Sequence, residues 1–309
     1  MLGGVKVLSA RDVRRAVPMR TAVRAVREAF RELADGSFVL PPRQVFGDGK
    51  VLVMSAYHAP TGTAVVKTIG IALDQVPAIR ATVVWTGNGT QLVAEGSSIT
   101  TLRTGAVVGV ATDLLAAADA ERLTVIGTGA QAPDQVRAVV AARPIADVVL
   151  AGRSAERAER LAQELRAEFP EVRFTAGTEV DAAVADAQII CCATSSATPL
   201  FSVDALPEHV HVNAIGAFRP TMRELPRDLL ADATTVLVDQ REAAMEESGE
   251  IIDAVTSGTL TTTALVELGE ALTTPPTPSG RTVFKSVGVG CQDWAIAAAL
   301  EHSLHRVAG

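Results

Sequence analysis

The chain has 309 residues, of which 48% are hydrophobic and 20% are charged, and its formal net charge is −7. This length and composition predict a globular protein with room for two domains. The acidic balance and the lack of a basic run argue against nucleic acid or an anionic membrane as a partner. We expect a soluble cytoplasmic protein, because no apolar run is long enough to cross a bilayer and no signal peptide opens the sequence.

The cysteines and histidines give no sign of a metal site. The three cysteines, two of them adjacent (Cys191 and Cys192), form neither a disulfide framework nor a zinc pattern. The five histidines show no metal-ligand spacing, so we interpret them as surface or packing residues. We therefore expect no metal.

The first third of the chain is typical of an α+β domain. A helical pattern runs from about Ser9 to Asp35, and Gly36 is a natural stop after it. Strand-like runs are expected at 51–54, 64–71 and 81–85. A second amphipathic helix is expected from about Ser98 to Leu115.

From Leu123 onward, strands and helices alternate regularly, which predicts a parallel sheet with helices on both faces. The expected strands are 123–126, 147–151, 172–174, 189–193, 210–215 and 236–238, and the expected helices are 130–142 and 155–169. The chain after Glu250 is expected to be helical and then to loop through 273–280. A closing helix at about 292–305 carries an apolar stripe, which suggests that it returns to the first domain. The fold class is therefore α/β.

A glycine-rich segment at the start of this region indicates dinucleotide binding. It reads G-x-G-x-x-A and consists of Gly127, Thr128, Gly129, Ala130, Gln131 and Ala132. The segment follows an expected strand and opens an expected helix, which is the context that the motif requires. The glycines allow a tight turn and a close approach of the pyrophosphate, and the helix N-terminus attracts its negative charge.

The end of the next strand favours NADP over NAD. An NAD site usually carries an acidic residue about 20 residues after the turn, where this chain has Arg153 and Ser154. A guanidinium and a hydroxyl suit a 2′-phosphate. The alternative is that Arg153 faces solvent and Ser154 only caps the next helix, in which case NAD is possible.

Three basic residues of the first domain occupy unusual positions. Strand alternation places Lys67 on an apolar face, and Arg103 interrupts an apolar helix stripe. Arg43 follows the stiff segment Pro41-Pro42. For each cation alone, a surface or internal salt bridge and a ligand role are both open, but together they suggest a pocket for a small carboxylate.

The chain resembles the ornithine cyclodeaminase/mu-crystallin family over essentially its whole length. The matching segments are Pro41-Pro42-Arg43, Met54 to Tyr57, Val66-Lys67, Ile99 to Ala106, the turn at 127–132, Asn213 to Ala217, Arg223-Glu224-Leu225, Phe284 to Gly288, and Gln292-Asp293. Several spaced motifs in the same order are more specific than any one of them.

The resemblance implies a homodimer whose Rossmann-type dinucleotide-binding domain (118–290) is inserted into an α+β substrate-binding and dimerisation domain (1–117 and 291–309). It implies that Arg43, Lys67 and Arg103 hold the substrate carboxylate, and that Lys67 is also placed for proton transfer. We also assign Thr104, Ala193 and Thr194 to the cofactor site.

One position departs from the cyclodeaminases. Where these carry an aspartate after Ile-Gly-Ala, this chain has Phe218, which we assign to the substrate site. Phenylalanine takes up no proton and pairs with no ammonium, and the sequence identifies no acid in its place.

The reading that we favour is reduction of a small, cyclic imino acid by NAD(P)H, for example Δ1-pyrroline-2-carboxylate or Δ1-piperideine-2-carboxylate. Three alternatives remain open: ornithine cyclodeamination, amino-acid dehydrogenation, and NADPH-dependent binding of a small ligand without turnover.

Other charged and aromatic residues are interpreted as structural. Glu246, Glu247 and Glu250 are expected on a solvated helix face. Trp85 and Trp294 are expected to pack in the first domain or at a dimer interface. Lys285 has two readings, a surface position or an approach to the cofactor.

Overall fold

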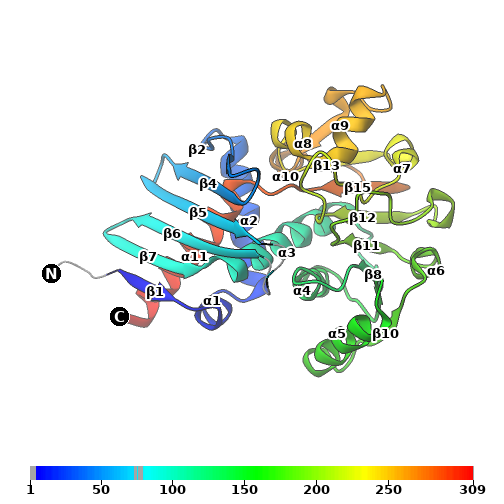
Figure 1. Cartoon of the computed structure of the whole chain (residues 1–309), viewed down its shortest axis with the longest axis horizontal. Helices are drawn as coiled ribbons and strands as arrows, with labels where there is room; N and C mark the ends of the chain where they lie inside the picture. Colours follow the sequence, from blue (N-terminus) through cyan, green and yellow to red (C-terminus); the bar gives the residue numbers. More distant parts are fainter. Residues whose placement is uncertain (1–4, 73–74, 76–78, 309) are drawn as a thin grey trace. The chain divides into compact units, whose positions relative to one another are not determined.

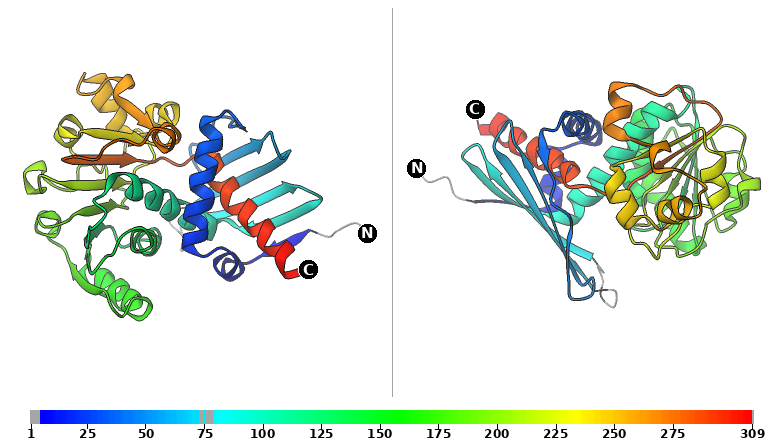
Figure 2. Two further views of the ribbon diagram at one scale, coloured as in Figure 1. Left: turned by 180° about the vertical axis from the view of Figure 1, so that it is seen from behind. Right: turned by 90° about the horizontal axis from the view of Figure 1, so that it is seen from above.

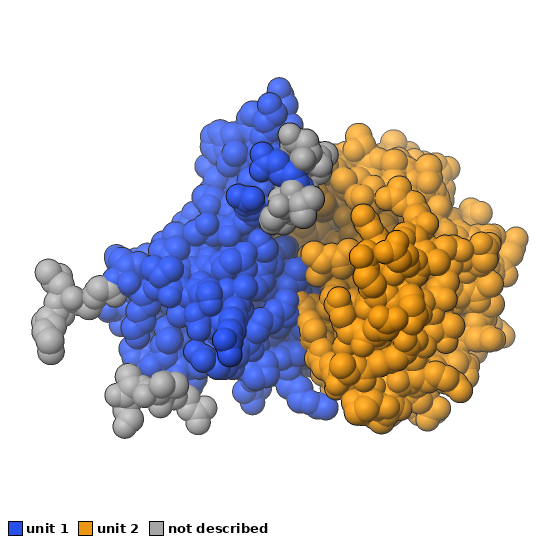
Figure 3. Space-filling view, turned by 60° about the horizontal axis from the view of Figure 1, so that its bottom comes forward, with its two compact units in different colours: residues 1–107, 289–309 blue, residues 108–288 orange. Residues whose placement is uncertain are grey.

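The computed structural model describes residues 5–72, 75 and 79–308, with side chains described as far as His305. Two compact units are distinguished by colour in Figure 3: residues 1–107 with 289–309 form unit 1, and residues 108–288 form unit 2. The division at 107/108 falls inside helix α3 (Gly96–Leu115), ahead of the boundary at 117/118 expected from the sequence. None of the described helices combines the length and the apolar character needed to cross a membrane.

The described residues of unit 1 form a seven-stranded sheet in the order β1-β7-β6-β5-β4-β2, with β3 paired to β4. Its strands are β1 (Lys6–Leu8), β2 (Phe38–Val39), β3 (Gln44–Phe46), β4 (Val51–His58), β5 (Thr63–Ile71), β6 (Ile79–Gly87) and β7 (Thr90–Glu95). Strand β1 runs parallel to β7, whereas β4, β5, β6 and β7 pair antiparallel. The α+β character expected from the sequence is confirmed.

Helices cover one face of this sheet. Helix α2 (Met19–Ala34) and helix α11 (Gly290–Ala308) lie side by side across the strands, as the left view of Figure 2 shows. The closing helix expected from the sequence therefore packs within unit 1. Strand residues alternate between this covered face and the opposite one, so Leu52 and Met54 are buried while Val51 and Tyr57 are exposed.

The single helix expected from Ser9 to Asp35 is wrong, because the segment forms two helices. Helix α1 (Ala10–Ala16) begins at a capping box between Ser9 and Asp12, and α2 begins after Pro18. Proline has no N–H and its ring clashes with the preceding turn, so it starts a helix but does not continue one. The expected stop at Gly36 is confirmed, since Gly36 has a φ of +75°.

The face of the unit 1 sheet opposite α2 and α11 is rich in exposed apolar side chains. Val51, Tyr57, Val66 and Val84 are 41%, 44%, 39% and 40% exposed. Strand register places all four on the same side, because Ser55, Val66 and Val84 lie in one row across β4, β5 and β6. Lys67 is in the adjacent row and points to the covered face.

Unit 2 carries an eight-stranded, all-parallel sheet in its described residues, with the order β10-β9-β8-β11-β12-β15-β13-β14. Its strands are β8 (Arg122–Ile126), β9 (Asp147–Ala151), β10 (Arg173–Gly177), β11 (Ile189–Cys192), β12 (Val210–Ala214), β13 (Thr235–Val238), β14 (Leu265–Glu267) and β15 (Arg281–Lys285). Its helices are α4 (Ala132–Ala142), α5 (Ala155–Glu168), α6 (Val180–Val184), α7 (Arg227–Asp232), α8 (Arg241–Glu247), α9 (Gly249–Thr256) and α10 (Leu268–Thr273), and the 3₁₀ turns are η1 (Val203–Ala205) and η2 (Thr262–Ala264). Figure 1 labels β10, β8, β11, β12, β15 and β13, which follow one another across the sheet in this order. The Rossmann-type α/β prediction is confirmed.

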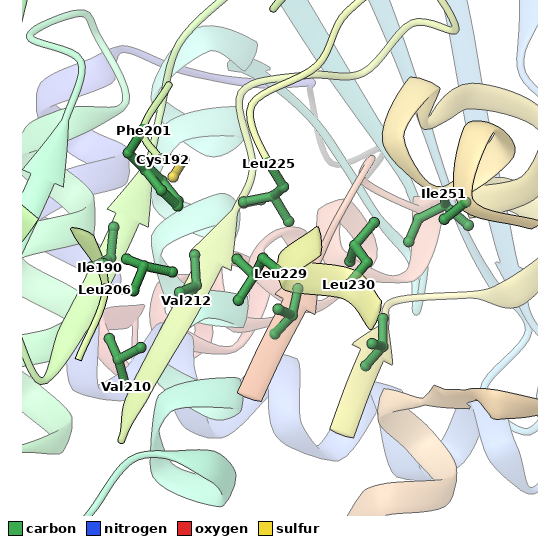
Figure 4. Packing of buried hydrophobic residues seen from close by; sticks show 14 of the residues in the cluster. Ile190, Cys192, Phe201, Leu206, Val210, Val212, Leu225, Leu229, Leu230 and Ile251 are labelled. Carbon is green, nitrogen blue, oxygen red and sulfur yellow. The ribbon is translucent and has the colours of Figure 1, made fainter. Parts of the chain in front are cut away.

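The core of unit 2 forms where apolar side chains from the strands meet the helices that flank them. Figure 4 shows Ile190 and Val212 from neighbouring strands in the same apolar cluster as Leu229 and Leu230 of α7. All four are fully buried. Strands of a parallel sheet covered on both faces are apolar throughout, as β11 is, and this explains why two adjacent cysteines sit there as buried thiols.

Six of the described strands are missing from the sequence analysis: β1, β2, β3, β7, β14 and β15. Strand β15 lies between β12 and β13, so the penultimate element of the chain occupies the interior of the sheet. Its sequence, Arg-Thr-Val-Phe-Lys, is short and flanked by charges. A pattern of this kind looks like an edge strand or a loop until the sheet order is known.

Candidate active site

The glycine-rich turn of unit 2 has the geometry that a dinucleotide needs. Strand β8 ends at Ile126, and Gly127 adopts a φ of +107°. A Cβ at Gly127 would lie 2.4 Å from the Ala193 carbonyl oxygen, so a larger residue does not fit. A Cβ at Gly129 would meet no atom within 4 Å, which leaves open space above the turn.

This open space lies at the N-terminus of a helix. Helix α4 begins at Ala132, two residues later than expected, with Gln131 as its N-cap residue. The first turn of a helix offers unpaired N–H groups and a partial positive charge. The turn from Gly127 to Gln131, including Thr128 and Ala130, therefore fits the pyrophosphate of a dinucleotide.

The residues expected at the ribose lie at the carboxyl end of β9. Arg153 is exposed, and the Ser154 hydroxyl accepts a hydrogen bond of 3.3 Å from the Arg157 N–H, so it caps α5. A Cβ at the preceding Gly152 would lie 3.1 Å from Thr128 Cγ2, which brings this end of β9 against the turn. Capping leaves Ser154 able to bind phosphate as well, and both readings of Arg153 stay open.

A buried carboxylate holds together two loops at the carboxyl ends of β11 and β12. Glu224 is fully buried, and its Oε1 accepts hydrogen bonds from the Thr194 N–H at 2.7 Å and the Thr194 hydroxyl at 2.9 Å. Its Oε2 accepts from the Gly216 N–H at 2.8 Å and the Ala217 N–H at 3.0 Å. Burial raises the pKa of Glu224, although Lys285 and these N–H donors oppose the shift. The role of Glu224 as a clamp was not predicted.

A buried ion pair lies beside this clamp. Lys285 is fully buried, contacts Glu250 at 2.9 Å and donates a hydrogen bond of 2.6 Å to the Ala217 carbonyl. Glu250 in turn accepts from the Glu224 N–H at 3.3 Å. The expectation of a solvated Glu250 is wrong, and so is the surface reading of Lys285, because each residue neutralises the other in the interior.

The three candidate cations come together in unit 1. Lys67 on β5 and Arg103 on α3 are 0% and 7% exposed, and Arg43 is half-buried. The pKa of Lys67 is lowered to about 8: burial lowers it most, Asp293 opposes this shift, and the positive charges of Arg103 and Arg43 add to it. Because the charges of both Arg103 and Arg43 act on the pKa of Lys67, the three cations lie near one another.

Asp293, in the first turn of α11, is the counter-ion of this cluster. Lys67 Nζ donates to its Oδ1 at 2.8 Å and lies 2.7 Å from its Oδ2. The Nε of Arg103 is 3.8 Å from Oδ1. Asp293 was part of the family motif, but its pairing with Lys67 was not predicted, because 226 residues separate the two in sequence.

Arg103 also has a partner next to Asp293. Its Nη1 donates to the Gln292 side-chain oxygen, whereas the Arg103 Nε and the Gln292 Nε2 are buried without a hydrogen-bond partner among the described residues. Buried N–H groups normally have acceptors. Two cations around one carboxylate leave one positive charge, so the cluster is suited to a ligand carboxylate that would accept from both donors.

The remaining candidate residues divide between the units. Phe218 is half-buried in unit 2 just after β12, and the guanidinium carbon of Arg219 lies 5.5 Å from its ring centre. Thr194 and Ala193 are half-buried after β11 in the same unit. Thr104, in contrast, is a buried residue of α3 in unit 1, next to Arg103.

The two tryptophans pack together in unit 1, as expected. The ring centres of Trp85 and Trp294 are 5.9 Å apart, and Trp294 also contacts His58 and Phe38. Within the described residues, no group of three or more His, Cys, Asp or Glu side chains is arranged to hold a metal ion.

Comparisons with known proteins extend over both units. The model of the ornithine cyclodeaminase/mu-crystallin family matches residues 5–306. A Delta(1)-pyrroline-2-carboxylate reductase of Bacillus cereus is 40% identical over 225 residues, which are 70% of this chain and 67% of that protein. The ketimine reductase mu-crystallin of Mus musculus is 32% identical over 281 residues, which are 87% of this chain and 86% of that protein. A solved structure of Thermococcus litoralis Delta(1)-pyrroline-2-carboxylate reductase, in complex with NADH and L-proline, matches with a TM-score of 0.92 and 25% identity and covers 98% of each chain.

Proposed function

Because the chain belongs to the ornithine cyclodeaminase/mu-crystallin family, as its motifs predicted, we propose that it reduces a small cyclic imino acid to the amino acid with NAD(P)H. The substrates that we favour are Δ1-pyrroline-2-carboxylate and Δ1-piperideine-2-carboxylate, which would give proline and pipecolate. The reductase names of the relatives support this choice. The observation that carries the proposal is the buried cation cluster of unit 1, whose two unpartnered donors suit one carboxylate.

The residues of unit 1 then have distinct tasks. Arg103 and Gln292 bind the substrate carboxylate through the Arg103 Nε and the Gln292 Nε2. Reduction adds a hydride to the imine carbon and a proton to the nitrogen, and the nicotinamide cofactor supplies the hydride when bound. Lys67 supplies the proton from its ammonium group and regains one from solvent, since a pKa of about 8 keeps most of it charged at neutral pH.

Phe218 fits this chemistry better than it fits a cyclodeaminase. Its ring is apolar, so it would pack against a compact imino-acid ring but would not bind the charged side-chain amine of ornithine. The position after β12 thus favours a substrate without a second amino group.

For the cofactor we propose NADPH, with Arg153 and Ser154 at the 2′-phosphate. The support is chemical: a guanidinium and a hydroxyl follow β9 where NAD sites carry an acidic residue. A cytoplasmic location stays a prediction.

We propose that the working protein is a homodimer that pairs through the exposed face of the unit 1 sheet. The support is the set of exposed apolar side chains on the sheet face that α2 and α11 leave uncovered, among them Tyr57, Val66 and Val84. Exposed apolar patches of this kind usually mark an interface. The substitution pair V66K/V84K should convert a dimer to a monomer in light scattering, whereas a monomeric native protein would refute the pairing.

The direct test mixes the purified protein with Δ1-pyrroline-2-carboxylate and either NADPH or NADH, and follows the nicotinamide absorbance. Rapid oxidation, faster with NADPH, is expected. Absence of oxidation with both nucleotides and both imino acids would overturn the proposal. In that case ammonia release from ornithine, or tight NADPH binding without turnover, would identify the alternative reactions.

A further inference from the structure

Lys67 lies in an apolar row of the unit 1 sheet. Strand register aligns it with Met54 on β4, Val83 on β6 and Ala94 on β7, and all four side chains are buried on the face covered by α2 and α11. An ammonium group in such a row has no strand neighbour that accepts a hydrogen bond. Its charge therefore depends on what the covering helix supplies.

The helix that covers this row is fixed at its first residue. A Cβ at Gly290 would lie 2.6 Å from the Ser55 carbonyl oxygen, so α11 begins in direct contact with the backbone of β4. Asp293 lies in the first turn of α11, where the partial positive charge of the helix N-terminus favours a carboxylate. The close contact at Gly290 thus brings Asp293 to Lys67.

Neighbouring residues of α11 contact different cations. Asp293 contacts Lys67 Nζ through both carboxylate oxygens, at 2.8 and 2.7 Å, and Gln292 accepts from Arg103 Nη1. Gln292 and Asp293 are 0% and 1% exposed. One helix turn therefore sets the orientation of both the ammonium and the guanidinium.

We infer that Asp293 is a positioning residue that keeps Lys67 in place and charged as the proton donor, and that Gln292 orients Arg103 and shares its carboxylate ligand. This inference rests on the proposed imino-acid reduction and deepens it. The proton that reaches the imine nitrogen leaves Lys67 Nζ, and Asp293 keeps its negative charge throughout. Asp293 thus acts through Lys67 and need not touch the substrate.

The pH dependence of turnover distinguishes this role from simple packing. Burial lowers the pKa of Lys67 to about 8, and Asp293 opposes that shift. Turnover needs the ammonium form, so kcat should fall above about pH 8 in the native protein, roughly tenfold for each pH unit. Without the carboxylate, the fall should begin at lower pH.

The experiment measures kcat and KM from pH 5.5 to 10 in the native protein and in Asp293→Asn. We expect the alkaline limb of the Asn variant to move down by at least one pH unit, and kcat at pH 7.5 to fall at least tenfold. Glu301→Gln is the matched control, because Glu301 is a largely buried acid of the same helix, bonded to His305 at 3.1 Å. It should keep the native profile.

Two further variants keep the inference falsifiable if Asp293→Asn fails to fold. Asp293→Glu keeps the charge on a longer side chain, so kcat should fall about tenfold with the alkaline limb close to its native position. Gln292→Leu should raise the KM for the imino acid about tenfold with little change in kcat. Calorimetric titration with L-proline gives a readout apart from turnover, and binding should weaken above about pH 8 in the native protein.

The outcomes separate the two proposals. An unmoved alkaline limb in Asp293→Asn, or an unchanged kcat in Asp293→Glu, would overturn the positioning role of Asp293. An unchanged KM in Gln292→Leu would overturn the role of Gln292. In these cases turnover by the native protein would still support imino-acid reduction. No turnover in the native protein with any imino acid would instead overturn the proposed function itself, and the inference with it.

Discussion

Both units bury a lysine against a carboxylate, but the charge left over differs. In unit 1, Lys67 pairs with Asp293, and Arg103 is the additional charge. In unit 2, Lys285 pairs with Glu250, and Glu224 is the additional charge. The first cluster therefore has a surplus cation and the second has a surplus anion.

The two surplus charges differ in how many hydrogen bonds they make within their own unit. Glu224 accepts four hydrogen bonds from the loops around it, so its charge is satisfied within unit 2. Arg103 keeps a buried Nε that has no hydrogen-bond partner in the described part of the chain. A satisfied buried charge stabilises the architecture, whereas an unsatisfied one is suited to a ligand.

The largest expected difference comes from the two lysines. Lys67→Ala should lower kcat by about 10³-fold, because a general acid typically contributes a factor of this order. Lys285→Met should instead lower the free energy of unfolding by about 3–5 kcal/mol, because it leaves Glu250 buried without a counter-ion. Steady-state kinetics and denaturant unfolding of both variants test this. Undiminished turnover in Lys67→Ala would remove Lys67 from the mechanism.

The next effect concerns the surplus guanidinium. Arg103→Lys keeps the charge but loses the planar set of donors, so the KM for the imino acid should rise about 100-fold with a smaller change in kcat. Saturation curves at fixed NADPH measure this split. An equal loss in kcat and no change in KM would place Arg103 elsewhere in the reaction.

A smaller effect is expected at the clamp. Glu224→Gln replaces one acceptor oxygen by a donor, so two of the four hydrogen bonds from the loops are lost. The KM for NADPH should rise about tenfold, because the loop at Thr194 loses order, while the KM for the imino acid should rise less, through Phe218 beside Ala217. Asp147→Asn, which breaks the partly exposed pair with Arg173, is the control and should change neither constant. A rise in the imino-acid KM alone would contradict the assignment.

The smallest effect is expected at Arg153, which we propose to contact the 2′-phosphate of the cofactor. Arg153 is exposed, so Arg153→Ala should reduce the preference for NADPH over NADH by only about fivefold, which is the upper range for an exposed ion pair. Arg157→Ala, a few residues further on the same surface, should leave the ratio of the two kcat/KM values unchanged. An unaltered ratio in Arg153→Ala would restore the reading of Arg153 as a solvent-facing residue.

Much of the fold follows from local patterns in the sequence. The alternation after Leu123 predicted the parallel sheet, and Gly127 to Ala132 predicted the phosphate-binding turn. Pro18 was overlooked as a break, although its missing N–H is a local signal. Strand β15 was missed because its place inside the sheet depends on sheet order, which five residues do not encode.

The candidate site was predictable only in part, because some of its contacts join residues that are far apart in the sequence. Lys67 and Arg103 stand out because each places a charge among apolar neighbours. Asp293 and Glu224 lie in helix and loop segments where acids are common, so nothing local distinguishes them from solvated residues. Their importance comes from partners that are distant in sequence.

The position of β15 has a consequence for biosynthesis. Strand β15 separates β12 from β13, so these strands have no direct hydrogen bonds to each other and depend on a segment that the ribosome makes later. A nascent chain that ends before Arg281 therefore exposes two apolar strand edges, which can pair with other chains. Unit 2 cannot complete its sheet in the order of synthesis, and its last folding step must wait for β15 to be inserted.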